Sequence, residues 1–288
     1  YEPGLLALVS STVAAGRLNF LHELGEAVGD ANLVLLAVGT PSRRGDGHAD
    51  LTHVYDAAEL VARALRRFTV VVTKSTVPVG TGDEIERIIS AISPRADFSV
   101  VANPEFLRQG AAISDFQRPA RIIIGTDDAR ANSVMEEMYA PFTRDGAPLV
   151  RVSRRTAELT KYASNAFLAM KLAFINEMAD LCEATGADVG DVAYGMGLDS
   201  RIAPGFLEAG PGYGGSCLPK DARALLRTAH EFGSELSLVR AAVNANEKRQ
   251  GRIVEKIVAA CGGCVPGKKV AILGLAFKPG TDDLREAP

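Results

Sequence analysis

The segment best suited to chemistry reads GPGYGGSCLPKD and runs from Gly210 to Asp221. Four glycines and a proline precede Cys217, and Pro219 stands where a helix could begin, because proline is favoured in a first helical turn. The thiol would then lie on a loop at a helix N-terminus, where the helix dipole and free amides favour the thiolate form. The alternative is a tight turn around a small buried cysteine. The glycine run and the helix start favour a reactive nucleophile.

Three polar side chains could support such a thiol. Asp221 falls in the first turn of the same helix, where it either complements the dipole or reaches the thiol or an attacking water. Lys161 and Asn165 are four residues apart in a helical stretch, so they project from one face. A lysine and an amide together can hold a developing oxyanion or orient water. A solvated surface pair is the commoner meaning of this spacing, and both interpretations stay open.

Three loops in the first half of the chain follow apolar runs. They read VGTP at 38–41, KSTVPVG at 74–80 and NPEFL at 103–107. Open parallel sheets bind ligands at the carboxyl ends of their strands, where these loops would lie. The hydroxyls of the first two loops could contact a ribose or a phosphate, and Glu105 supplies a carboxylate at the same edge.

Other kinds of chemistry have weaker support. No G-x-G-x-x-G follows a first strand, so the dinucleotide fingerprint is absent from the sequence, and Gly274 follows a strand-like run without a third glycine. The four histidines lie outside the segments above, which disfavours a histidine-driven hydride transfer. Cys261 and Cys264 form a CxxC pair without a second pair of ligands, so we expect no metal site.

The elements that must position these residues follow from the periodicity. Between residues 30 and 152, short apolar runs alternate with amphipathic stretches, which is typical of βαβ units and a mostly parallel sheet. The runs are ANLVLLAV, TVVVT, FSVVAN, RIIIG and PLVRV. Residues 51–67 and 81–92 have helical spacing and charged outer faces, so we expect crossover helices there. The predicted fold class is α/β, with a doubly wound, Rossmann-like parallel sheet.

A helical part follows from residue 153. Residues 154–185 contain no Gly or Pro, and Gly186 is a suitable helix stop, so the sequence predicts one long central helix. Further helices are expected at 188–196, 219–232 and 236–260. The run KKVAIL, after CGGCVPG, predicts the first buried strand of a second α/β domain. The chain starts without Met and stops soon after this run, so both ends are expected to be cut.

Composition narrows the class of protein. A chain of 288 residues, 47% of them hydrophobic, can build two domains of ordinary size. Its 32 basic and 35 acidic residues give a formal net charge of -3 without a basic stripe, so nucleic acid is not an expected partner. The apolar runs are far shorter than the roughly 20 residues that span a bilayer, so no membrane role is expected. Four cysteines without a disulfide pattern favour the cytoplasm.

With these segments in order, the chain closely resembles the UDP-glucose/GDP-mannose dehydrogenase family. The matching segments are YEPGL at 1, GRLNF at 16, AVGTP at 37, KSTVPVG at 74, NPEFL at 103, ELTKYASNAF at 158, FINEMADLCE at 174, GYGGSCLPKD at 212 and GLAFKPGTDDLRE at 274. The resemblance implies three domains. Residues 1–152 would be an NAD-binding Rossmann-like domain without its first strand and glycine loop, 153–262 a central helical dimerisation region that carries the cysteine loop, and 263–288 the start of a nucleotide-sugar domain.

The resemblance also implies a reaction. A nucleotide sugar would lose two hydrides from C6 to two NAD+, through a thiohemiacetal and a thioester on Cys217, and water would release the uronate. Oxidation of UDP-glucose to UDP-glucuronate is the favoured reaction, and a homodimer through the central helices is expected. GDP-mannose oxidation is the alternative, and a UDP-N-acetylmannosamine dehydrogenase fits the PKD after the cysteine less well. A catalytically silent dimerising fragment is the rival from another class.

Roles of individual residues are carried over from the resemblance. The residues expected at the reacting carbon are the nucleophile Cys217 with Lys161, Asn165, Asp221, Glu105 and Thr76. Those expected at NAD are Thr40, Ser75, Thr76, Gln109 and Arg285. Those expected at the nucleotide sugar are Glu105, Phe106, Leu107, Lys161, Asn165, Gly212, Tyr213, Gly214, Phe277 and Lys278, with Arg201 reaching in from a partner subunit. Gln109 departs from the family, which usually has glutamate there, so cofactor binding or rate would change if that side chain touches the chemistry.

Overall fold

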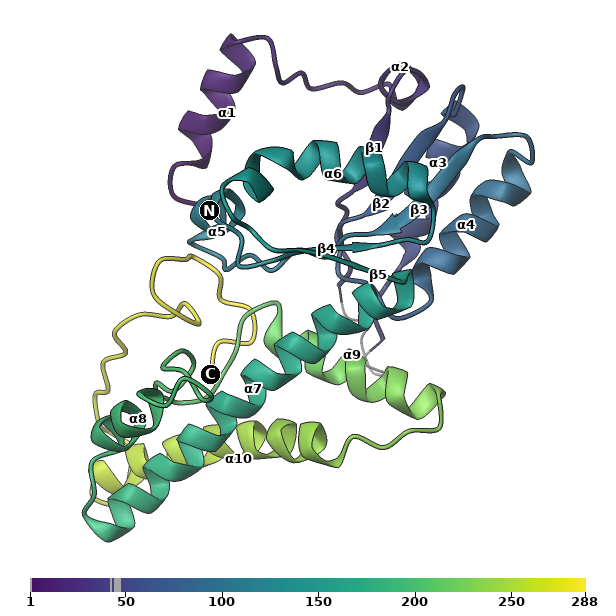
Figure 1. Cartoon of the computed structure of the whole chain (residues 1–288). Coiled ribbons are helices and arrows are strands. Elements are labelled where there is room, and N and C mark those ends of the chain that lie inside the picture. Colours follow the sequence, from purple (N-terminus) through teal and green to yellow (C-terminus); the bar gives the residue numbers. More distant parts are fainter. Residues whose placement is uncertain (1, 42, 44–47) are drawn as a thin grey trace. The chain divides into compact units, whose positions relative to one another are not determined.

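The computed structural model describes residues 2–41, 43 and 48–288. The chain divides into two compact units, Tyr1–Lys161 and Tyr162–Pro288. The division falls inside one continuous helix, α7 (Arg154–Thr185), which has the limits that the absence of Gly and Pro predicts (Figure 1). The domain limits expected after residues 152 and 262 stay predictions.

The first unit contains the predicted α/β sheet. Its five strands are β1 (Leu33–Leu36), β2 (Thr69–Thr73), β3 (Phe98–Ala102), β4 (Ile122–Gly125) and β5 (Leu149–Val152), in that order across the sheet. All neighbours run parallel except β3 and β4, which meet in antiparallel sense at a single pair, Ala102 and Gly125. The prediction of a mostly parallel sheet is confirmed, with each strand formed inside one of the five apolar runs.

Two helices precede the first strand, α1 (Leu5–Ala14) and α2 (Leu24–Gly29). The helices that connect the strands are α3 (Thr52–Ala64), α4 (Thr81–Ile92), α5 (Ala112–Gln117) and α6 (Ala129–Arg144). The helix predicted at 81–92 has the predicted limits, whereas α3 ends before residue 67, because Leu65 is extended and leads the chain toward β2.

Two apolar layers bury the two faces of the sheet. On one face, Val71 of β2 packs in a core with Val54 of α3 and Ile85 of α4. On the other, Val72 packs in a core with Met135 of α6. Strands buried on both faces read as continuous apolar runs, which explains why TVVVT shows no alternation. The sheet and the helices on its two faces therefore form three layers, and this packing fixes the loops at the strand ends (Figure 1).

The second unit is helical. Beyond the second part of α7 it contains α8 (Val189–Gly197), α9 (Leu218–Glu231) and α10 (Ser237–Ala260). Its core joins Tyr162 and Ala166 of α7 to Ala224 and Leu225 of α9. These helices lie within one or two residues of the predicted ranges, because capping residues and Gly/Pro breaks mark their ends in the sequence.

The strand predicted in KKVAIL is not formed. Residues 268–273 have no strand structure, and the side chain of Leu273 is 97% exposed. A strand needs a neighbour for its backbone hydrogen bonds and an apolar face for its side chains. The described residues of this unit supply no other strand, so the segment has no strand to pair with (Figure 1, yellow trace).

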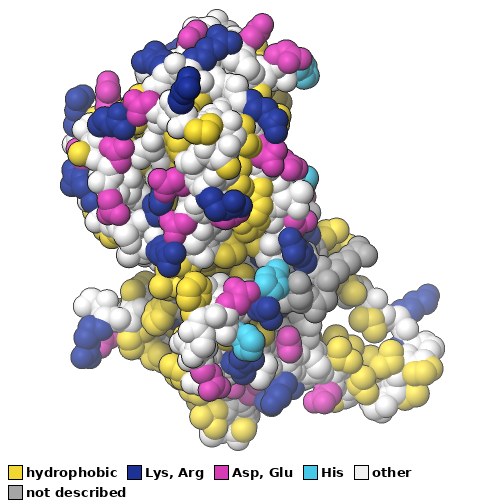
Figure 2. All heavy atoms as spheres, turned by 90° about the vertical axis from the view of Figure 1, so that its right-hand side faces the viewer, with side chains coloured by type: hydrophobic (Ala, Val, Ile, Leu, Met, Phe, Trp, Pro, Cys, Tyr) yellow, Lys and Arg dark blue, Asp and Glu magenta, His cyan; other side chains and the backbone are white. Residues whose placement is uncertain are grey.

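The surface has a mixed charge. On the face that Figure 2 turns toward the viewer, Lys and Arg side chains are interspersed with Asp and Glu. Across the described part of the chain, no helix has both the length and the apolar character needed to cross a membrane.

Candidate active site

Cys217 is the N-cap residue of α9, as the glycine and proline pattern predicts. Its side chain is exposed, its Sγ lies 3.7 Å from Oγ of Ser216, and Pro219 occupies the first turn of the helix. The carbonyl of Cys217 accepts the amide of Asp221 across 2.8 Å, which closes that first turn. The thiol is therefore open to solvent at the positive end of a 14-residue helix, and the alternative of a buried structural cysteine is wrong.

The glycines before the thiol allow close packing of the loop. A Cβ on Gly214 would lie 2.1 Å from the carbonyl oxygen of Glu286, and one on Gly215 would lie 2.6 Å from the ring of Phe277. Gly215 also has a φ of 81° and donates its amide to the carbonyl of Arg285 at 3.0 Å. The segment from Phe277 to Glu286 thus lies directly against the cysteine loop.

Asp221 lies at the centre of a buried polar cluster. It is 1% exposed, its Oδ2 accepts the side-chain amide of Asn165 at 2.6 Å, and its Oδ1 pairs with Nζ of Lys220 at 2.7 Å. Both carboxylate oxygens therefore have partners, and Asn165 is held in one orientation. Lys220 was not among the residues expected from the sequence, although its place beside Asp221 in LPKD was a usable signal.

Lys161 is buried rather than solvated, so the interpretation as a surface pair is wrong. Its side chain is 4% exposed, and its Nζ lies 3.2 Å from Oε1 of Glu105 and 5.3 Å from the ring centre of Phe106. The other carboxylate oxygen of Glu105 accepts the amide of Leu107 at 2.5 Å. A buried ammonium needs such a partner, and the pair fixes the NPEFL loop next to α7.

Lys74 is a further charged residue at these loops, and it was not among the site residues expected from the sequence. Its Nζ donates to Oδ1 of Asn103 at 3.0 Å and to the hydroxyl of Tyr139 at 3.2 Å. Burial lowers the pKa of Lys74 to about 8; Glu105 opposes this shift and Lys161 adds to it. Lys74 therefore joins the KSTVPVG loop to the NPEFL loop. The lysine stood inside a recognised motif, but nothing in the sequence showed its partner Tyr139.

Hydroxyl groups tie the first two loops together. Thr40 donates to the carbonyl of Thr76 at 2.9 Å, and Ser75 donates to the carbonyls of Val38 at 2.6 Å and Leu36 at 3.2 Å. The structure therefore brings Thr40, Ser75 and Thr76 to one edge, at the carboxyl ends of β1 and β2. The lone pairs of these hydroxyls can accept hydrogen bonds from the ribose hydroxyls of a nucleotide.

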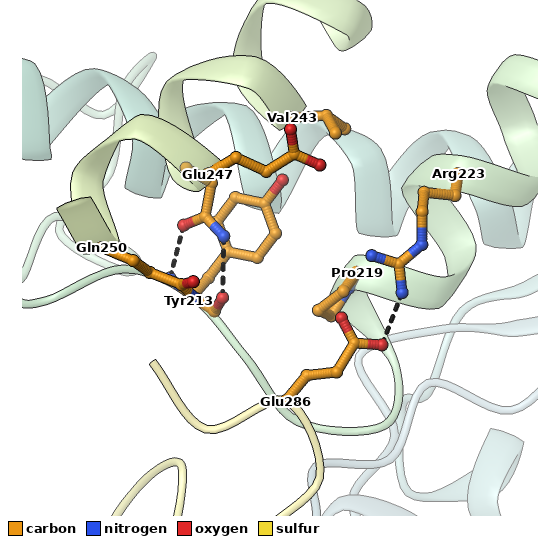
Figure 3. A pocket seen from close by; sticks show the side chains of 8 residues that line it. Tyr213, Pro219, Arg223, Val243, Glu247, Gln250 and Glu286 are labelled. Carbon is orange, nitrogen blue, oxygen red and sulfur yellow. Dashed lines mark hydrogen bonds and ion pairs between the residues drawn. The ribbon is translucent and has the colours of Figure 1, made fainter.

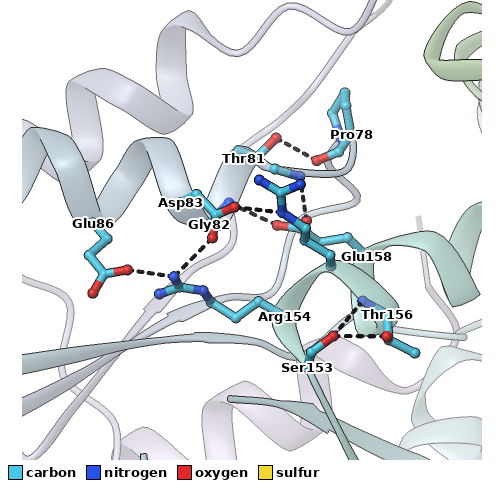
Figure 4. A network of polar contacts seen from close by, with 11 residues as sticks. Pro78, Thr81, Gly82, Asp83, Glu86, Ser153, Arg154, Thr156 and Glu158 are labelled. Atoms are coloured by element: carbon cyan, nitrogen blue, oxygen red, sulfur yellow. Dashed lines mark hydrogen bonds and ion pairs between the residues drawn. The ribbon is translucent and has the colours of Figure 1, made fainter. Parts of the chain in front are cut away.

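The first turn of α7 is anchored on the same loop (Figure 4). Glu158 is 3% exposed and accepts the amides of Gly80 at 2.7 Å and Gly82 at 2.8 Å, at the start of α4. Burial raises the pKa of Glu158, and the two backbone hydrogen bonds oppose that shift. Arg154 adds an ion pair to Asp83 at 2.9 Å. Glu158 stands one turn before Lys161, so this anchor fixes the helix that carries both.

The sequence matches a known family over most of its length. Residues 1–143 match the NAD binding domain, and residues 155–248 the central domain, of the UDP-glucose/GDP-mannose dehydrogenase family. The chain belongs to this family. NAD is accordingly the cofactor of the domain that residues 1–143 form.

Individual relatives of the family cover the whole chain. A UDP-glucose 6-dehydrogenase of Rhizobium meliloti is 60% identical, and one of Bacillus subtilis is 47% identical; each aligns with 100% of this chain. A solved UDP-glucose dehydrogenase of Pyrobaculum islandicum superimposes with a TM-score of 0.94 at 42% identity, over 100% of this chain and 66% of its own. The chain spans 66% of the length of the Rhizobium relative and 64% of the Bacillus one.

The residues suggested by the family fall into two groups, one in each unit. Those in the first unit are Thr40, Ser75, Thr76, Glu105, Phe106, Leu107, Gln109 and Lys161. Those in the second unit are Asn165, Arg201, Gly212, Tyr213, Gly214, Cys217, Asp221, Phe277, Lys278 and Arg285. Lys161 and Asn165 stand one turn apart on α7. Gln109 is half-buried in the turn before α5, where the family usually has glutamate.

Arg201 and Arg285 of the second unit have different surroundings. The side chain of Arg201 is 88% exposed and pairs with Asp199 at 2.6 Å, so its guanidinium is held at the surface. Arg285 pairs with Asp283 at 2.7 Å, and hydrogen bonding to that carboxylate raises the pKa of Arg285, with a smaller contribution from Cys217. The backbone of Arg285 lies against the cysteine loop, since its carbonyl accepts the amide of Gly215 at 3.0 Å.

Tyr213 is a buried residue of the cysteine loop (Figure 3). Its ring is 5% exposed, and burial raises the pKa of its hydroxyl to about 12. It lines a small cavity of about 110 Å³ together with Pro219 and Arg223, whose guanidinium pairs with Glu286 at 2.5 Å. Within the described residues, no cluster of His, Cys, Asp or Glu has the geometry to hold a metal ion.

Proposed function

We propose that the protein oxidises the C6 hydroxyl of UDP-glucose to a carboxylate through a thioester on Cys217. The observation that carries this proposal is an exposed thiol at the N-terminus of α9, four residues before Asp221, which is buried and paired with Asn165 and Lys220. A reactive sulfur beside fixed proton-handling groups suits covalent capture of an aldehyde. The names of the 60% and 47% identical relatives support UDP-glucose as the substrate.

NAD+, when bound, accepts one hydride in each of the two oxidations. The hydroxyls of Thr40, Ser75 and Thr76 fit such a group, because they line the strand ends where open parallel sheets bind nucleotides. Gln109 and Arg285 are the other residues proposed to contact it. The amide of Gln109 can still form hydrogen bonds but brings no negative charge, so it would bind the cofactor without acting as a base.

The chain's own residues would act in sequence on the sugar. A general base takes the proton of the C6 hydroxyl as the first hydride leaves, which gives an aldehyde. The Cys217 thiolate attacks that carbon, and Lys161 and Asn165 stabilise the oxygen anion of the thiohemiacetal. Loss of the second hydride gives a thioester. Water activated by the Asp221 cluster or Glu105 then cleaves the carbon–sulfur bond, which releases the uronate and the thiolate.

The sugar itself would be held by the two loops named for it. We propose that Glu105, Phe106 and Leu107 contact it from NPEFL, and that the residues Gly212, Tyr213, Gly214, Phe277 and Lys278 contact it from the cysteine loop and the segment packed on it. In the described chain, Lys278 lies over the Phe277 ring at 5.6 Å, so an ammonium is already placed beside an apolar surface. A cation beside a ring suits a nucleotide, which carries phosphates and a flat base.

The experiment compares the full-length gene product with two cysteine variants. Wild-type protein with UDP-glucose is expected to form two NADH per uronate, and Cys217→Ser is expected to form no uronate. Cys264→Ser is the matched control, since Cys264 is also a free, exposed thiol. Uronate production by Cys217→Ser at the wild-type rate would remove the thioester from the mechanism.

The same assay tests the alternatives. GDP-mannose replaces UDP-glucose in a parallel reaction, and faster NADH formation with it would favour the GDP-mannose activity. The 288-residue chain is assayed alongside the full-length gene product. Turnover by the latter with none by the former would support a silent fragment for this chain only.

A homodimer through the central helices is part of the proposal. Phe167, Phe174 and Leu181 follow one another at intervals of seven residues on α7 and are 62%, 45% and 55% exposed. Apolar side chains at this interval form a stripe along one face of a helix. A second copy of the chain is the proposed occupant of this stripe, and Arg201 would then extend toward the neighbouring site. Phe174→Glu should give a monomer in light scattering, and an unchanged dimer would contradict the proposed interface.

A further inference from the structure

Three buried polar side chains of α7 and α10 hold the backbone of the cysteine loop. They are Asn176, Asn246 and Arg249, which are 4%, 9% and 7% exposed. Polar groups are buried at a cost in free energy unless their hydrogen bonds are complete, so each must have a partner in the fold. Here the partners are the backbone amides and carbonyls at the start of the loop.

Asn246 makes the most specific of these contacts. Its Oδ1 accepts the amide of Tyr213 at 2.8 Å, and its Nδ2 donates to the carbonyl of the same residue at 3.0 Å. The dashed lines at Tyr213 in Figure 3 mark this pair. The side-chain amide thus satisfies both backbone groups of one residue, as a neighbouring β-strand would. Of the twenty side chains, only asparagine and glutamine offer a donor and an acceptor on a flat amide.

Gly210 is held in a similar way at the beginning of the loop. Its amide donates to Oδ1 of Asn176 at 2.8 Å, and its carbonyl accepts from Nε of Arg249 at 3.0 Å. Arg249 in turn forms an ion pair with Asp180 of α7. Side chains of α7 and α10 therefore hold the loop at two residues, Gly210 and Tyr213, and the second of these stands four positions before Cys217.

We infer that Asn246 is a positioning residue for Cys217, a role that rests on the proposed function. The glycines between Tyr213 and the thiol contribute no side chains that could hold the loop. Without the Asn246 contacts, both backbone groups of Tyr213 would be buried without these partners, and the loop would lose its fixed start. Misplacement of a reacting group by about 1 Å can slow a reaction by about a hundredfold. Asn246 would not touch the substrate, so it acts through the loop alone.

The test uses Asn246→Ala in the full-length gene product, with Asn244→Ala as the matched control. Asn244 is exposed on the same helix and is not part of the site. The expected result for Asn246→Ala is a kcat lower by about ten- to a hundredfold, with an unchanged KM for NAD+. The aldehyde should also escape capture more often, so a carbonyl-trapping reagent should recover more of it. Asn244→Ala should match the wild type in all three.

Hydrogen exchange at the Tyr213 amide supplies a readout that needs no substrate. This amide should exchange about tenfold faster in Asn246→Ala, because a buried hydrogen-bonded pair is lost, while amides inside α9 and α10 keep their protection. A wild-type protein without dehydrogenase activity would refute the proposed function, and faster exchange at Tyr213 in Asn246→Ala would still show that Asn246 holds the loop. Unchanged exchange at Tyr213 would refute the present inference alone.

The kcat and the folding of the variants also test the positioning role of Asn246. A kcat within about twofold of wild type, despite faster exchange at Tyr213, would overturn the positioning role, because the expected fall of about ten- to a hundredfold would be missing. If Asn246→Ala does not fold, Asn246→Asp replaces it, since the carboxylate keeps the acceptor for the Tyr213 amide and lacks the donor. Its kcat should fall between those of the alanine variant and wild type. A wild-type kcat, or failure of both variants to fold, would overturn the inference.

Discussion

Asn165 donates its side-chain amide to Oδ2 of Asp221 across 2.6 Å, and both side chains are buried. Asn165→Asp would place two carboxylates at this distance, so we expect the free energy of unfolding to fall by about 3 kcal/mol near neutral pH. Part of the lost stability should be regained at acid pH, because one proton shared by the two carboxylates removes the repulsion between them. Urea unfolding measures both, and Asn244→Asp on the exposed side of α10 is the control. Equal urea midpoints for Asn165→Asp and wild type would contradict the pairing.

Glu158 should make stability depend on pH in an unusual direction for a carboxylate. Burial raises its pKa in the folded state above the ordinary 4.5, so the folded state holds this proton to higher pH than the unfolded state. Its contribution is therefore complete below 4.5 and is lost as the pH rises through the raised pKa. Relative to wild type, Glu158→Gln should gain stability as the pH rises from acid to neutral.

A surface carboxylate gives the control for that experiment. Hydrogen bonding to Arg151 lowers the pKa of Glu136, so its contribution should be lost as the pH falls. Glu136→Gln should thus show the opposite trend, or none. Parallel pH profiles of wild type and Glu158→Gln would show that burial of Glu158 does not affect its titration.

Lys74 should make the stability of the protein depend on pH in the alkaline range. Its pKa falls from the ordinary 10.5 to about 8 on folding, so between these values the unfolded state binds more protons. Stability should therefore rise with pH above about 8, by at most about 3 kcal/mol, and Lys74→Met should lack this rise. Tyr139 opposes the trend only above its ordinary pKa of 10.0. Urea unfolding from mildly alkaline pH up to that value tests the prediction, with exposed Lys248→Met as control. A rise that persists in Lys74→Met would assign it to another group.

A side chain at position 214 should cause a steric clash close to the thiol. A Cβ there would lie 2.1 Å from the carbonyl oxygen of Glu286, so Gly214→Ala must displace the segment that packs on the loop. Overpacking of this kind costs about 1–3 kcal/mol, and turnover should fall as well, because the loop carries Cys217. Gly210→Ala is the control, since a Cβ there meets nothing within 4 Å. Normal melting and normal turnover in Gly214→Ala would contradict the close approach.

The sequence predicted the strands and helices better than it predicted the contacts between side chains. Runs such as TVVVT and the Gly-free stretch of α7 carry local signals, so the strands and the long helix were predicted with nearly correct limits. KKVAIL carries the same local signal as a strand but has no strand beside it, and pairing is not a local property. The start of α9 was predictable for a different reason, because Pro219 marks a first turn.

The partners of the site residues were much less predictable. Helical spacing placed Lys161 and Asn165 on one face, but whether that face met water depended on Glu105, 56 residues away in sequence. Lys74 and Tyr139 are 65 residues apart and meet only because β2 and α6 pack together. Asn246 had no signal at all, since a single asparagine on a helix usually faces water.

Because α7 is unbroken between Lys161 and Asn165, the angular phase of these two residues is set by the helix itself. Inserting or deleting one amino acid between them would turn the side chain of Asn165 by about 100° around the helix axis relative to that of Lys161, and only a change of whole turns would restore the phase. Natural length variants of the protein should therefore differ in their loops and keep this four-residue step.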